Sequence, residues 1–596
     1  MDTNRLKRFA QDARRELQKI VKALLPLVLA ENSAARREKP QTVAELEKTR
    51  KALGDEALID KIAYTWFNRF CALRFMDVMG YNSIRIVSPL PGHFQPEILE
   101  EAKGGNIDET FVADSKYRER IKGLLDGTIP AVDGQAEAYK LLLVSACNAY
   151  NKVMPFLFQK IDDYTELLMP DDLMKENSIL MKTRDAITED VAADGVEVIG
   201  WLYQFYISEK KDEVMGKTVK TEDIPAATQL FTPDWIVRYL VQNSLGRLWM
   251  LNHPNSKLAE EMEYYIPPTE DDKDFIEVKS PEEIRLCDPC CGSGHMLTYA
   301  FDLLVKIYEE EGYDRRKIPA FILTNNLHGI EIDPRAGELA AFALTMKARE
   351  YDSRFLRREN APYPQICVLQ NITFDEGEIP QYMDAIRHDL FTENLQQTLH
   401  QFTQADCFGS LIVPKISNAD AVMEELAARD VDENIFLASI YDKVLDVINQ
   451  SDYLSQKYHV VVTNPPYMGS KGMNADLKRF AERLYPDSKS DLFAMFIERC
   501  LQLVRYQGTI GMITMQSWMF LSSFEKLRTK LLDENTILSM AHLGARGFDS
   551  IGGEVVQTTA FTMTNTLIPD YKGAFIRLVD GNNESEKAAM FQEAIR

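Results

Sequence analysis

The chain has 596 residues, 45% of them hydrophobic, and a formal net charge of −23 at pH 7. This length is enough for about two to four domains with a core each, and the apolar content excludes an intrinsically disordered protein. The longest apolar run, residues 20–30, is too short to cross a bilayer, and the charged N-terminus lacks the pattern of a secretory signal. The eight cysteines suggest no disulfide framework. We therefore expect a protein of the reducing cytoplasm without a membrane span, whose overall charge neither requires nor excludes a nucleic-acid partner.

Residues 1–225 are predicted to form a mostly α-helical N-terminal domain, because apolar residues recur there every three to four positions. The clearest helix is 58–81, in which aromatic residues and methionines are interleaved with arginines. Such a face could stack on nucleotides, but a core helix whose arginines pair or extend toward water is the favoured interpretation.

Residues 226–596 show a different pattern, with short apolar runs separated by helical stretches. These runs lie at 283–288, 327–333, 365–370, 458–464 and 508–514. Strands that alternate with helices predict an α/β fold, a Rossmann-like doubly wound parallel sheet. Three later runs, at 536–543, 555–564 and 573–580, predict an antiparallel edge. The gap between 371 and 458 is too long for one crossover and predicts a helical insertion at about 375–456.

The segment "RLCDPCCGSGHML" at 285–297 carries three cysteines and a histidine. Cys287, Cys290 and Cys291 form only half of a zinc pattern, because no second cysteine or histidine pair follows at a suitable spacing. Pro289 and Cys290 also resemble the nucleophile of cytosine carbon-5 methyltransferases, but in those enzymes that cysteine belongs to a different segment. We therefore expect neither a metal site nor a nucleophilic cysteine here.

A ligand-binding turn explains the same segment better. The strand is predicted to end at Asp288, and a helix to begin near His295 or Met296. Between them, Gly292 and Gly294 allow positive φ and a close approach of the backbone to a ligand. The glycines alone would equally suit a dinucleotide site or a packing turn.

Three other segments place polar groups where they could serve one site. Glu331 ends the next strand, where its carboxylate could accept hydrogen bonds from both hydroxyls of a ribose, and Ile332 could pack on an adenine face. In "NPPY", at 464–467, consecutive prolines hold the Asn464 side chain and the Pro465 carbonyl as acceptors. Thr232 and Pro233 precede a helix, and a hydroxyl with free N–H groups there could hold a carboxylate.

Together these motifs resemble those of amino methyltransferases that use S-adenosylmethionine, with "DPCCGSG" as the cofactor loop and "NPPY" as the catalytic motif. Their order, from Thr232 through Asp288–Gly294 to Asn464–Tyr467, is that of the gamma-class N6-adenine DNA methyltransferases. The helical N-terminus and "FTP" also resemble modification subunits of type I restriction systems. The closest resemblance, which includes "MDTNRLKRFAQDARRELQKIV" and extends over the whole chain, is to the PglX family, the adenine methyltransferases of BREX phage-exclusion systems.

The resemblance implies a methyltransferase domain that takes S-adenosylmethionine and acts on double-stranded DNA, together with other BREX proteins, in host DNA marking and phage exclusion. It assigns Asn464, Pro465, Pro466 and Tyr467 to catalysis, and Tyr467 with Phe548 to stacking on a flipped adenine. Its cofactor residues would be Thr232, Pro233, Asp288, Cys290, Gly292, Gly294, Glu331, Ile332 and Asn371. Asn371 stands where the family usually has an aspartate, and Phe548 is equally well explained as a core aromatic.

Other functions fit part of the same pattern. NPPY also serves enzymes that methylate RNA or protein glutamine, and a cofactor-binding effector subunit of a defence complex would carry the same motifs. The acidic run "DDKDFIEVK" at 271–279 superficially offers a nuclease site, but its spacing is short. The family's target-recognition domain follows the catalytic strands, so we expect it to be absent from a chain that ends at Arg596.

Overall fold

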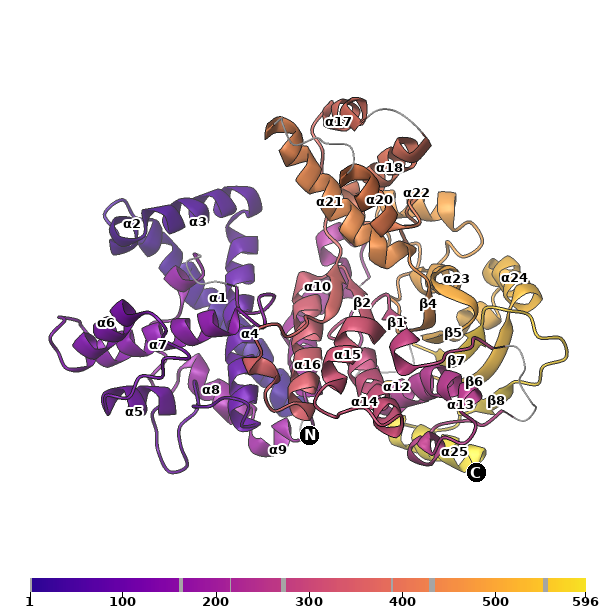
Figure 1. The fold of residues 1–596 in the computed structure, drawn as a ribbon, viewed down its shortest axis with the longest axis horizontal. Coiled ribbons are helices and arrows are strands. Elements are labelled where there is room, and N and C mark those ends of the chain that lie inside the picture. The colour runs from indigo at the N-terminus through magenta and orange to yellow at the C-terminus, as the bar shows by residue number, and fades with distance from the viewer. Residues whose placement is uncertain are drawn as a thin grey trace. The chain divides into compact units, whose positions relative to one another are not determined.

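The structure is a computed structural model that describes residues 3–159, 164–214, 216–268, 275–386, 390–427, 435–549 and 556–596. Its contacts divide the chain into two compact units (Figure 1). Unit 1 consists of Met1–Glu209 with Ala348–Tyr363, and unit 2 of Lys210–Lys347 with Pro364–Arg596. The division therefore falls earlier than the predicted boundary at 225/226, and one short segment from the middle of the chain groups with the N-terminal unit.

The described part of unit 1 is built from helices. They are α1 Thr3–Leu29, α2 Ala34–Glu38, α3 Pro40–Leu53, α4 Asp55–Val78, α5 Glu97–Lys103, α6 Ser115–Leu125, α7 Gly134–Tyr150, α8 Ile179–Ala186, α9 Glu189–Ala192 and α10 Glu197–Val214, whose last turn crosses into unit 2. α1 buries Leu6, Ala10, Ala13, Leu17, Val21 and Leu25. This spacing of three or four residues forms one apolar stripe, which packs on α4.

The arginines of α4 belong to the core, as the favoured interpretation predicted. Arg69 is fully buried, with its guanidinium 5.2 Å from the ring centroid of Trp66. Arg74 donates to the Ile187 carbonyl at 2.9 Å and to the Ser88 hydroxyl at 2.8 Å. The helix therefore uses these charges to satisfy backbone and side-chain oxygens inside unit 1.

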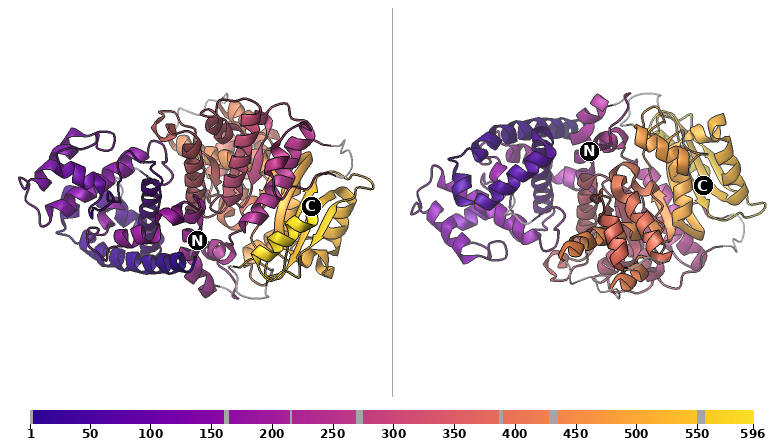
Figure 2. Two further views of the ribbon diagram at one scale, coloured as in Figure 1. Left: turned by 90° about the horizontal axis from the view of Figure 1, so that it is seen from below. Right: turned by 90° about the horizontal axis from the view of Figure 1, so that it is seen from above.

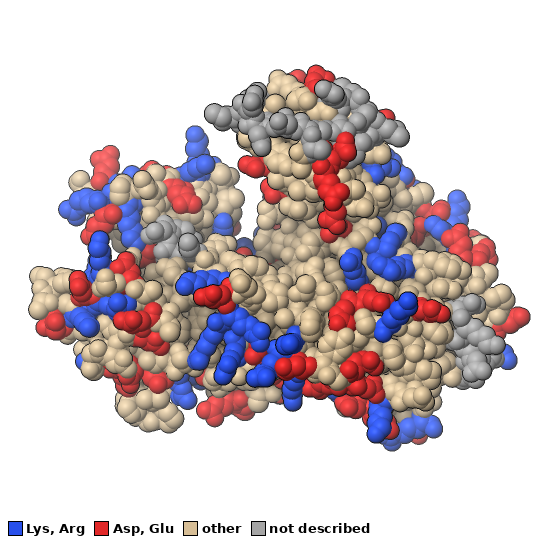
Figure 3. Space-filling view, viewed as in Figure 1, with Lys and Arg blue, Asp and Glu red and all other residues tan. Residues whose placement is uncertain are grey.

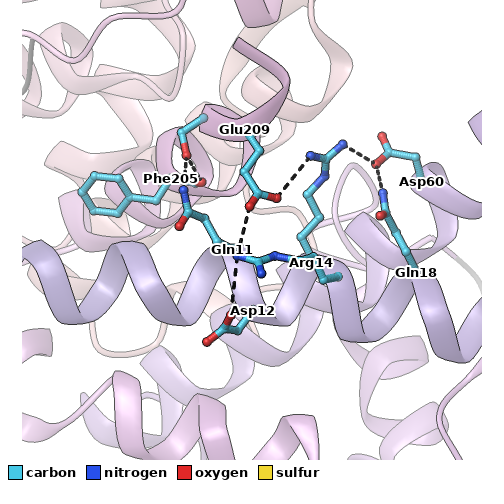
Figure 4. A network of polar contacts seen from close by, with 9 residues as sticks. Gln11, Asp12, Arg14, Gln18, Asp60, Phe205 and Glu209 are labelled. Atoms are coloured by element: carbon cyan, nitrogen blue, oxygen red, sulfur yellow. Dashed lines mark hydrogen bonds and ion pairs between the residues drawn. The ribbon is translucent and has the colours of Figure 1, made fainter. Parts of the chain in front are cut away.

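Polar contacts join α1 to α4 and α10 (Figure 4). Arg14 lies between Asp60, at 3.5 Å, and Glu209, at 4.0 Å, while Gln18 donates to Asp60 at 2.8 Å. Gln11 donates to the Ser208 hydroxyl at 3.0 Å. Partly exposed ion pairs of this kind contribute little each, so the apolar stripe supplies most of the stability and the polar contacts select the helix register.

Unit 2 contains an eight-stranded sheet in its described part, with strand order β3-β2-β1-β4-β5-β7-β6-β8. The strands are β1 Leu286–Asp288, β2 Leu327–Glu331, β3 Gln365–Val368, β4 Tyr458–Thr463, β5 Val504–Met515, β6 Thr536–Gly544, β7 Thr558–Thr564 and β8 Ala574–Arg577. β1 to β5 are parallel neighbours, and β1, β2 and β4 are buried along their whole length. The predicted α/β fold with a doubly wound sheet is confirmed.

The C-terminal edge of the sheet differs in detail from the predicted antiparallel arrangement. β7 alone is antiparallel to its neighbours, and it lies between β5 and β6. β8 pairs with β6 in parallel. The chain therefore passes from β7 across β6 to reach the outer edge, which short turns between neighbouring strands would not allow. The sequence pattern identified these strands but not their order.

Helices cover both faces of this sheet (Figures 1 and 2). Figure 1 shows α12 and α14 on one side of β4 to β7, with α23 and α24 on the other. The unit's helices are α11 Ile224–Thr228, α12 Asp234–Val241, α13 Arg247–Asn252, α14 His295–Glu310, α15 Ile318–Phe321, α16 Pro334–Tyr351 (ending in unit 1), α17 Glu378–Ile386, α18 Leu390–Gln401, α19 Ala405–Phe408, α20 Ala419–Ala427, α21 Ile435–Ser455, α22 Ala475–Leu484, α23 Leu492–Leu503, α24 Glu525–Glu534 and α25 Glu584–Ile595. The predicted insertion at about 375–456 holds α17 to α21.

Three further observations concern the surface charge, the apolar length of the helices and the acidic run at 271–279. On the face shown in Figure 3, lysine and arginine side chains gather in places among acidic ones, although the whole chain carries −23. Among the helices in the described ranges, none is long and apolar enough to span a membrane. Residues 271–274, part of the acidic run considered as a nuclease site, lie outside the described residues.

Candidate active site

The glycine turn lies between β1 and α14, as predicted. Gly292 has φ +53° and Gly294 has φ +88°, in the left-handed region that favours glycine. A Cβ on Gly294 would lie 3.1 Å from both the Cα and the Cβ of Ala340 in α16, so the turn also requires glycine for close helix packing. The Cys291 N–H donates to the Ile330 carbonyl at 3.0 Å, which ties the turn to the neighbouring strand β2.

Two buried carboxyl groups end the strands beside this turn. Glu331 accepts from the backbone N–H groups of Gly292, Ile332 and Asp333 at 2.8, 2.9 and 3.0 Å. A carboxylate has about four acceptor positions, so Glu331 keeps capacity for a ligand hydroxyl. Asp288, which is 1% exposed, accepts from the Cys290 N–H at 3.1 Å. Burial raises the pKa of each carboxyl group to about 7.

The NPPY segment begins directly after β4, and its asparagine faces Thr232. The Asn464 Nδ2 donates to the Thr232 hydroxyl at 3.1 Å and to the Leu230 carbonyl at 3.3 Å. The Asn464 Oδ1 is buried and has no hydrogen-bond partner in the described part of the chain. An unpaired buried acceptor costs free energy, so an oxygen of this kind on a residue that lines a cavity is a candidate partner for a ligand donor.

Tyr467 is held at both ends of its side chain. Its hydroxyl donates to the Ile513 carbonyl of β5 at 3.1 Å, and its ring meets Phe493 edge to face, with centroids 6.2 Å apart. The next residue, Met468, donates its N–H to Asp491 at 3.0 Å. The ring is therefore fixed beside the carboxyl end of β4.

One cavity joins these groups within unit 2. Its empty space, including the part that is open to solvent, amounts to about 940 Å³. Of the predicted residues, it is lined by Thr232, Asp288, Cys290, Gly292, Glu331, Ile332, Asn464 and Pro466. The strands' parallel order explains this, because their carboxyl ends meet at one edge of the sheet.

Several predicted residues lie outside the lining of that cavity: Pro233, Gly294, Asn371, Pro465, Tyr467 and Phe548. Asn371 is exposed, and its side-chain oxygen accepts from the Asp406 N–H at 3.1 Å, so it is engaged away from the cavity. Phe548 is 3% exposed on the loop after β6, as expected for a core aromatic.

The insertion supplies a wall that the sequence did not predict. Residues Cys407–Leu411 line the cavity, and Phe408 stacks on Phe480 with centroids 4.2 Å apart. The Ser410 hydroxyl donates to the Pro289 carbonyl of the glycine turn at 2.6 Å. Buried Arg499 of α23 donates to the carbonyls of Ser410 at 2.7 Å, Ile412 at 2.9 Å and Leu454 at 2.6 Å, which holds this wall in place. No short sequence motif in the insertion indicates that it forms part of the cavity wall.

The cysteines of the turn behave as small apolar residues. Burial raises the pKa of the Cys287, Cys290 and Cys291 thiols well above its usual range, so they are protonated at neutral pH. Within the described ranges, no group of three or more His, Cys, Asp or Glu side chains is arranged to hold a metal ion.

The sheet, its glycine turn, the acidic end of β2 and the NPPY segment after β4 define unit 2 as a Rossmann-like methyltransferase fold. The profile of the family Eco57I restriction-modification methylase matches residues 325–548. The adenine-specific methyltransferase BrxX of Escherichia coli O9:H4 (strain HS) is 42% identical over 98% of this chain and 52% of its own. The adenine-specific methyltransferase PglX of Lacticaseibacillus casei (strain Zhang) is 37% identical over 93% of this chain and 47% of its own. The chain is therefore similar over most of its length to the adenine-specific methyltransferases BrxX and PglX.

The chain spans about half the length of these curated relatives. Among solved structures, it resembles the DNA complex of DrdV, with 13% identity and a TM-score of 0.43 over 90% of this chain and 46% of that one. It also resembles the type IIL restriction-modification enzyme MmeI in complex with DNA, with 12% identity and a TM-score of 0.44. That match covers 96% of this chain and 58% of the MmeI chain.

Proposed function

We propose that the protein is a site-specific DNA adenine-N6 methyltransferase that uses S-adenosylmethionine and acts in BREX-type phage defence. The observation that carries the proposal is the buried Asn464 Oδ1, which has no hydrogen-bond partner among the described residues and belongs to a residue that lines the same cavity as the glycine turn and Glu331. An acceptor for an amine and a site for a nucleoside-like cofactor thus share one space. Similarity to BrxX and PglX, whose names state that they are adenine-specific methyltransferases, supports adenine as the target.

The residues of the cavity suit S-adenosylmethionine. Glu331 retains an acceptor position for a ribose hydroxyl, and Ile332 and Phe408 offer apolar surface for the adenine. The turn at Gly292 brings backbone close to the ligand without a side chain in between. S-adenosylmethionine, when bound, supplies a methyl group attached to a positively charged sulfur. Thr232, Asp288 and Cys290 would line its methionine portion.

The catalytic residues would act on the exocyclic amine of adenine. This nitrogen is a poor nucleophile because its lone pair is delocalised into the ring. The Asn464 oxygen and the Pro465 carbonyl can each accept one amine hydrogen, which moves electron density back to the nitrogen. The target base must first leave the DNA stack, and Tyr467 would stack on it, a contact worth about 1–3 kcal/mol. Phe548 remains our prediction for the opposite face of the base, and Asn371 for the cofactor adenine.

Double-stranded DNA and the other BREX proteins are the proposed partners, by resemblance to the PglX family, and the cytoplasm is where genomic DNA would be modified. The test is long-read sequencing for N6-methyladenine in DNA from cells that carry the protein with its BREX partners. We expect one modified sequence motif. Asn464→Ala should lower the rate about 10²–10³-fold, as for loss of a preorganised polar group, and so erase the motif.

Asn360→Ala is the matched control, because Asn360 is an exposed asparagine. It should leave the modified motif intact. If DNA carries no modified adenine in any strain, while RNA or release-factor glutamine is methylated in an Asn464-dependent way, the substrate assignment is wrong. If nothing is methylated although the cofactor binds, the protein is a cofactor-binding effector.

A further inference from the structure

We infer that Thr232 and the Leu230 carbonyl act as a clamp that sets which end of the Asn464 amide faces the target amine. The inference rests on the proposed function, since it concerns the same catalytic asparagine. The resemblance gave Thr232 only the task of holding a carboxylate of the cofactor. Here Thr232 is a positioning residue for Asn464, in addition to lining the cavity.

The two members of the clamp have different tasks: the Leu230 carbonyl selects the nitrogen end of the amide because it only accepts, whereas the Thr232 hydroxyl, which can donate or accept, fixes the position of the amide. A backbone carbonyl only accepts, so the Leu230 oxygen, 3.3 Å from Asn464 Nδ2, requires the nitrogen end of the amide. The Thr232 hydroxyl offers a lone pair to the same nitrogen at 3.1 Å and is 5% exposed, so water competes little for it. With the nitrogen held, the buried oxygen end has no hydrogen-bond partner in the part of the chain that the structure describes, on a residue that lines the cavity.

The prolines of NPPY cannot perform this task. They restrict the backbone, whereas the terminal torsion of an asparagine is broad and roughly two-fold. A half-turn would exchange Oδ1 and Nδ2 and present two donors to an amine that needs acceptors. Such a flipped side chain would also place an oxygen against the Leu230 oxygen. The clamp therefore selects the catalytically competent one of two nearly isosteric rotamers.

The segment that contains Leu230 and Thr232 also makes contacts with α10 and α14 and leads directly into α12. The Phe231 ring stacks on His295, the first residue of α14, with centroids 4.3 Å apart. Lys211 donates to the Gln229 carbonyl at 2.7 Å, and α12 begins at Asp234, two residues after Thr232. The helix after the glycine turn, the clamp and the catalytic asparagine thus form one continuous set of contacts.

The experiment compares Thr232→Val, which keeps the shape and removes the hydroxyl, with Thr232→Ser, which keeps the hydroxyl. Single-turnover methylation of duplex DNA at saturating S-adenosylmethionine should slow about 10- to 100-fold in Thr232→Val and stay near wild type in Thr232→Ser. Cofactor affinity, measured by calorimetry, should change much less than the rate. In an Asn464→Ala background, Thr232→Val should cost nothing further, because no amide remains to be oriented.

A rate that recovers fully at saturating cofactor, or losses that multiply in the double variant, would show instead that Thr232 serves only as a cofactor ligand. A second measurement needs no activity: in protein labelled with ¹⁵N-asparagine, the side-chain amide hydrogens of Asn464, assigned by their absence in Asn464→Ala, should exchange slowly. Thr232→Val should accelerate that exchange, and unchanged protection would overturn the clamp. If wild-type protein methylates no DNA, the proposed function fails while this exchange measurement still decides the clamp.

Discussion

Replacing Arg499 by methionine should destabilise unit 2 by about 3 kcal/mol. The guanidinium, 2% exposed, donates to three buried carbonyls at 2.6 to 2.9 Å. Each carbonyl left without a donor costs about 1–3 kcal/mol, which gives about 3–9 kcal/mol in total. Methionine avoids the cost of burying a charge, which recovers several kcal/mol and brings the net loss to the low end of that range.

Scanning calorimetry would measure this loss as a shift of the unit 2 transition. At about 2 °C per kcal/mol, the low end of the usual sensitivity because unit 2 is large, the melting temperature should fall by about 6 °C. Binding of S-adenosylmethionine should also weaken, because Ser410 of the cavity wall loses the contact that holds it against Pro289.

Arg528→Met provides the matched control. Arg528 also donates to two carbonyls, those of Trp518 and Leu521, but from a partly exposed position where water can replace it. We expect a loss below about 1 kcal/mol there. An Arg499→Met protein that melts within about 2 °C of wild type, with unchanged cofactor affinity, would refute the reasoning about the buried carbonyls.

Two further predictions concern the cofactor cavity. Glu331, whose pKa burial raises to about 7, is protonated below that pH and then loses a charged acceptor for a ribose hydroxyl, so affinity for S-adenosylmethionine should fall as the pH drops from 8 to 6. Asp288 titrates over the same range. Calorimetry should therefore show that Glu331→Gln makes the pH dependence of cofactor affinity shallower without removing it. An unchanged slope would contradict the role of Glu331. Gly294→Ala should lower the free energy of unfolding by about 2 kcal/mol, because it forces φ +88° on alanine and brings a methyl group 3.1 Å from Ala340. Denaturant unfolding would measure this loss. A stability equal to wild type would show that the turn relaxes.

The parts of the site that sequence predicts are those that need special backbone. Gly292 must adopt positive φ, and Pro465 and Pro466 must stiffen a loop, so the residue types themselves report the geometry. Glu331 was found because it ends a recognisable strand. The parallel strands were located correctly because a strand that is buried on both faces has a continuous apolar sequence.

The parts that sequence missed depend on contacts between distant segments. Phe408 and Ser410 reach the cavity through contacts with distant residues such as Arg499 and Pro289, and no local pattern encodes that docking. The orientation of the Asn464 amide depends on a backbone carbonyl at Leu230, which any residue type would provide. The order of β6, β7 and β8 likewise follows from how the chain crosses the sheet, and apolar periodicity carries no information on that.

The distance along the chain between the glycine turn and Arg499 has a consequence for synthesis. Ribosomes add about 5–20 residues per second, so roughly 10–40 s pass between the emergence of Asp288 and that of Arg499. Residues 407–411 of the wall emerge within this interval, but they lack the contacts from Arg499 until it ends. A ligand stabilises only a state that can bind it, so cofactor cannot rescue folding errors made before Arg499 appears.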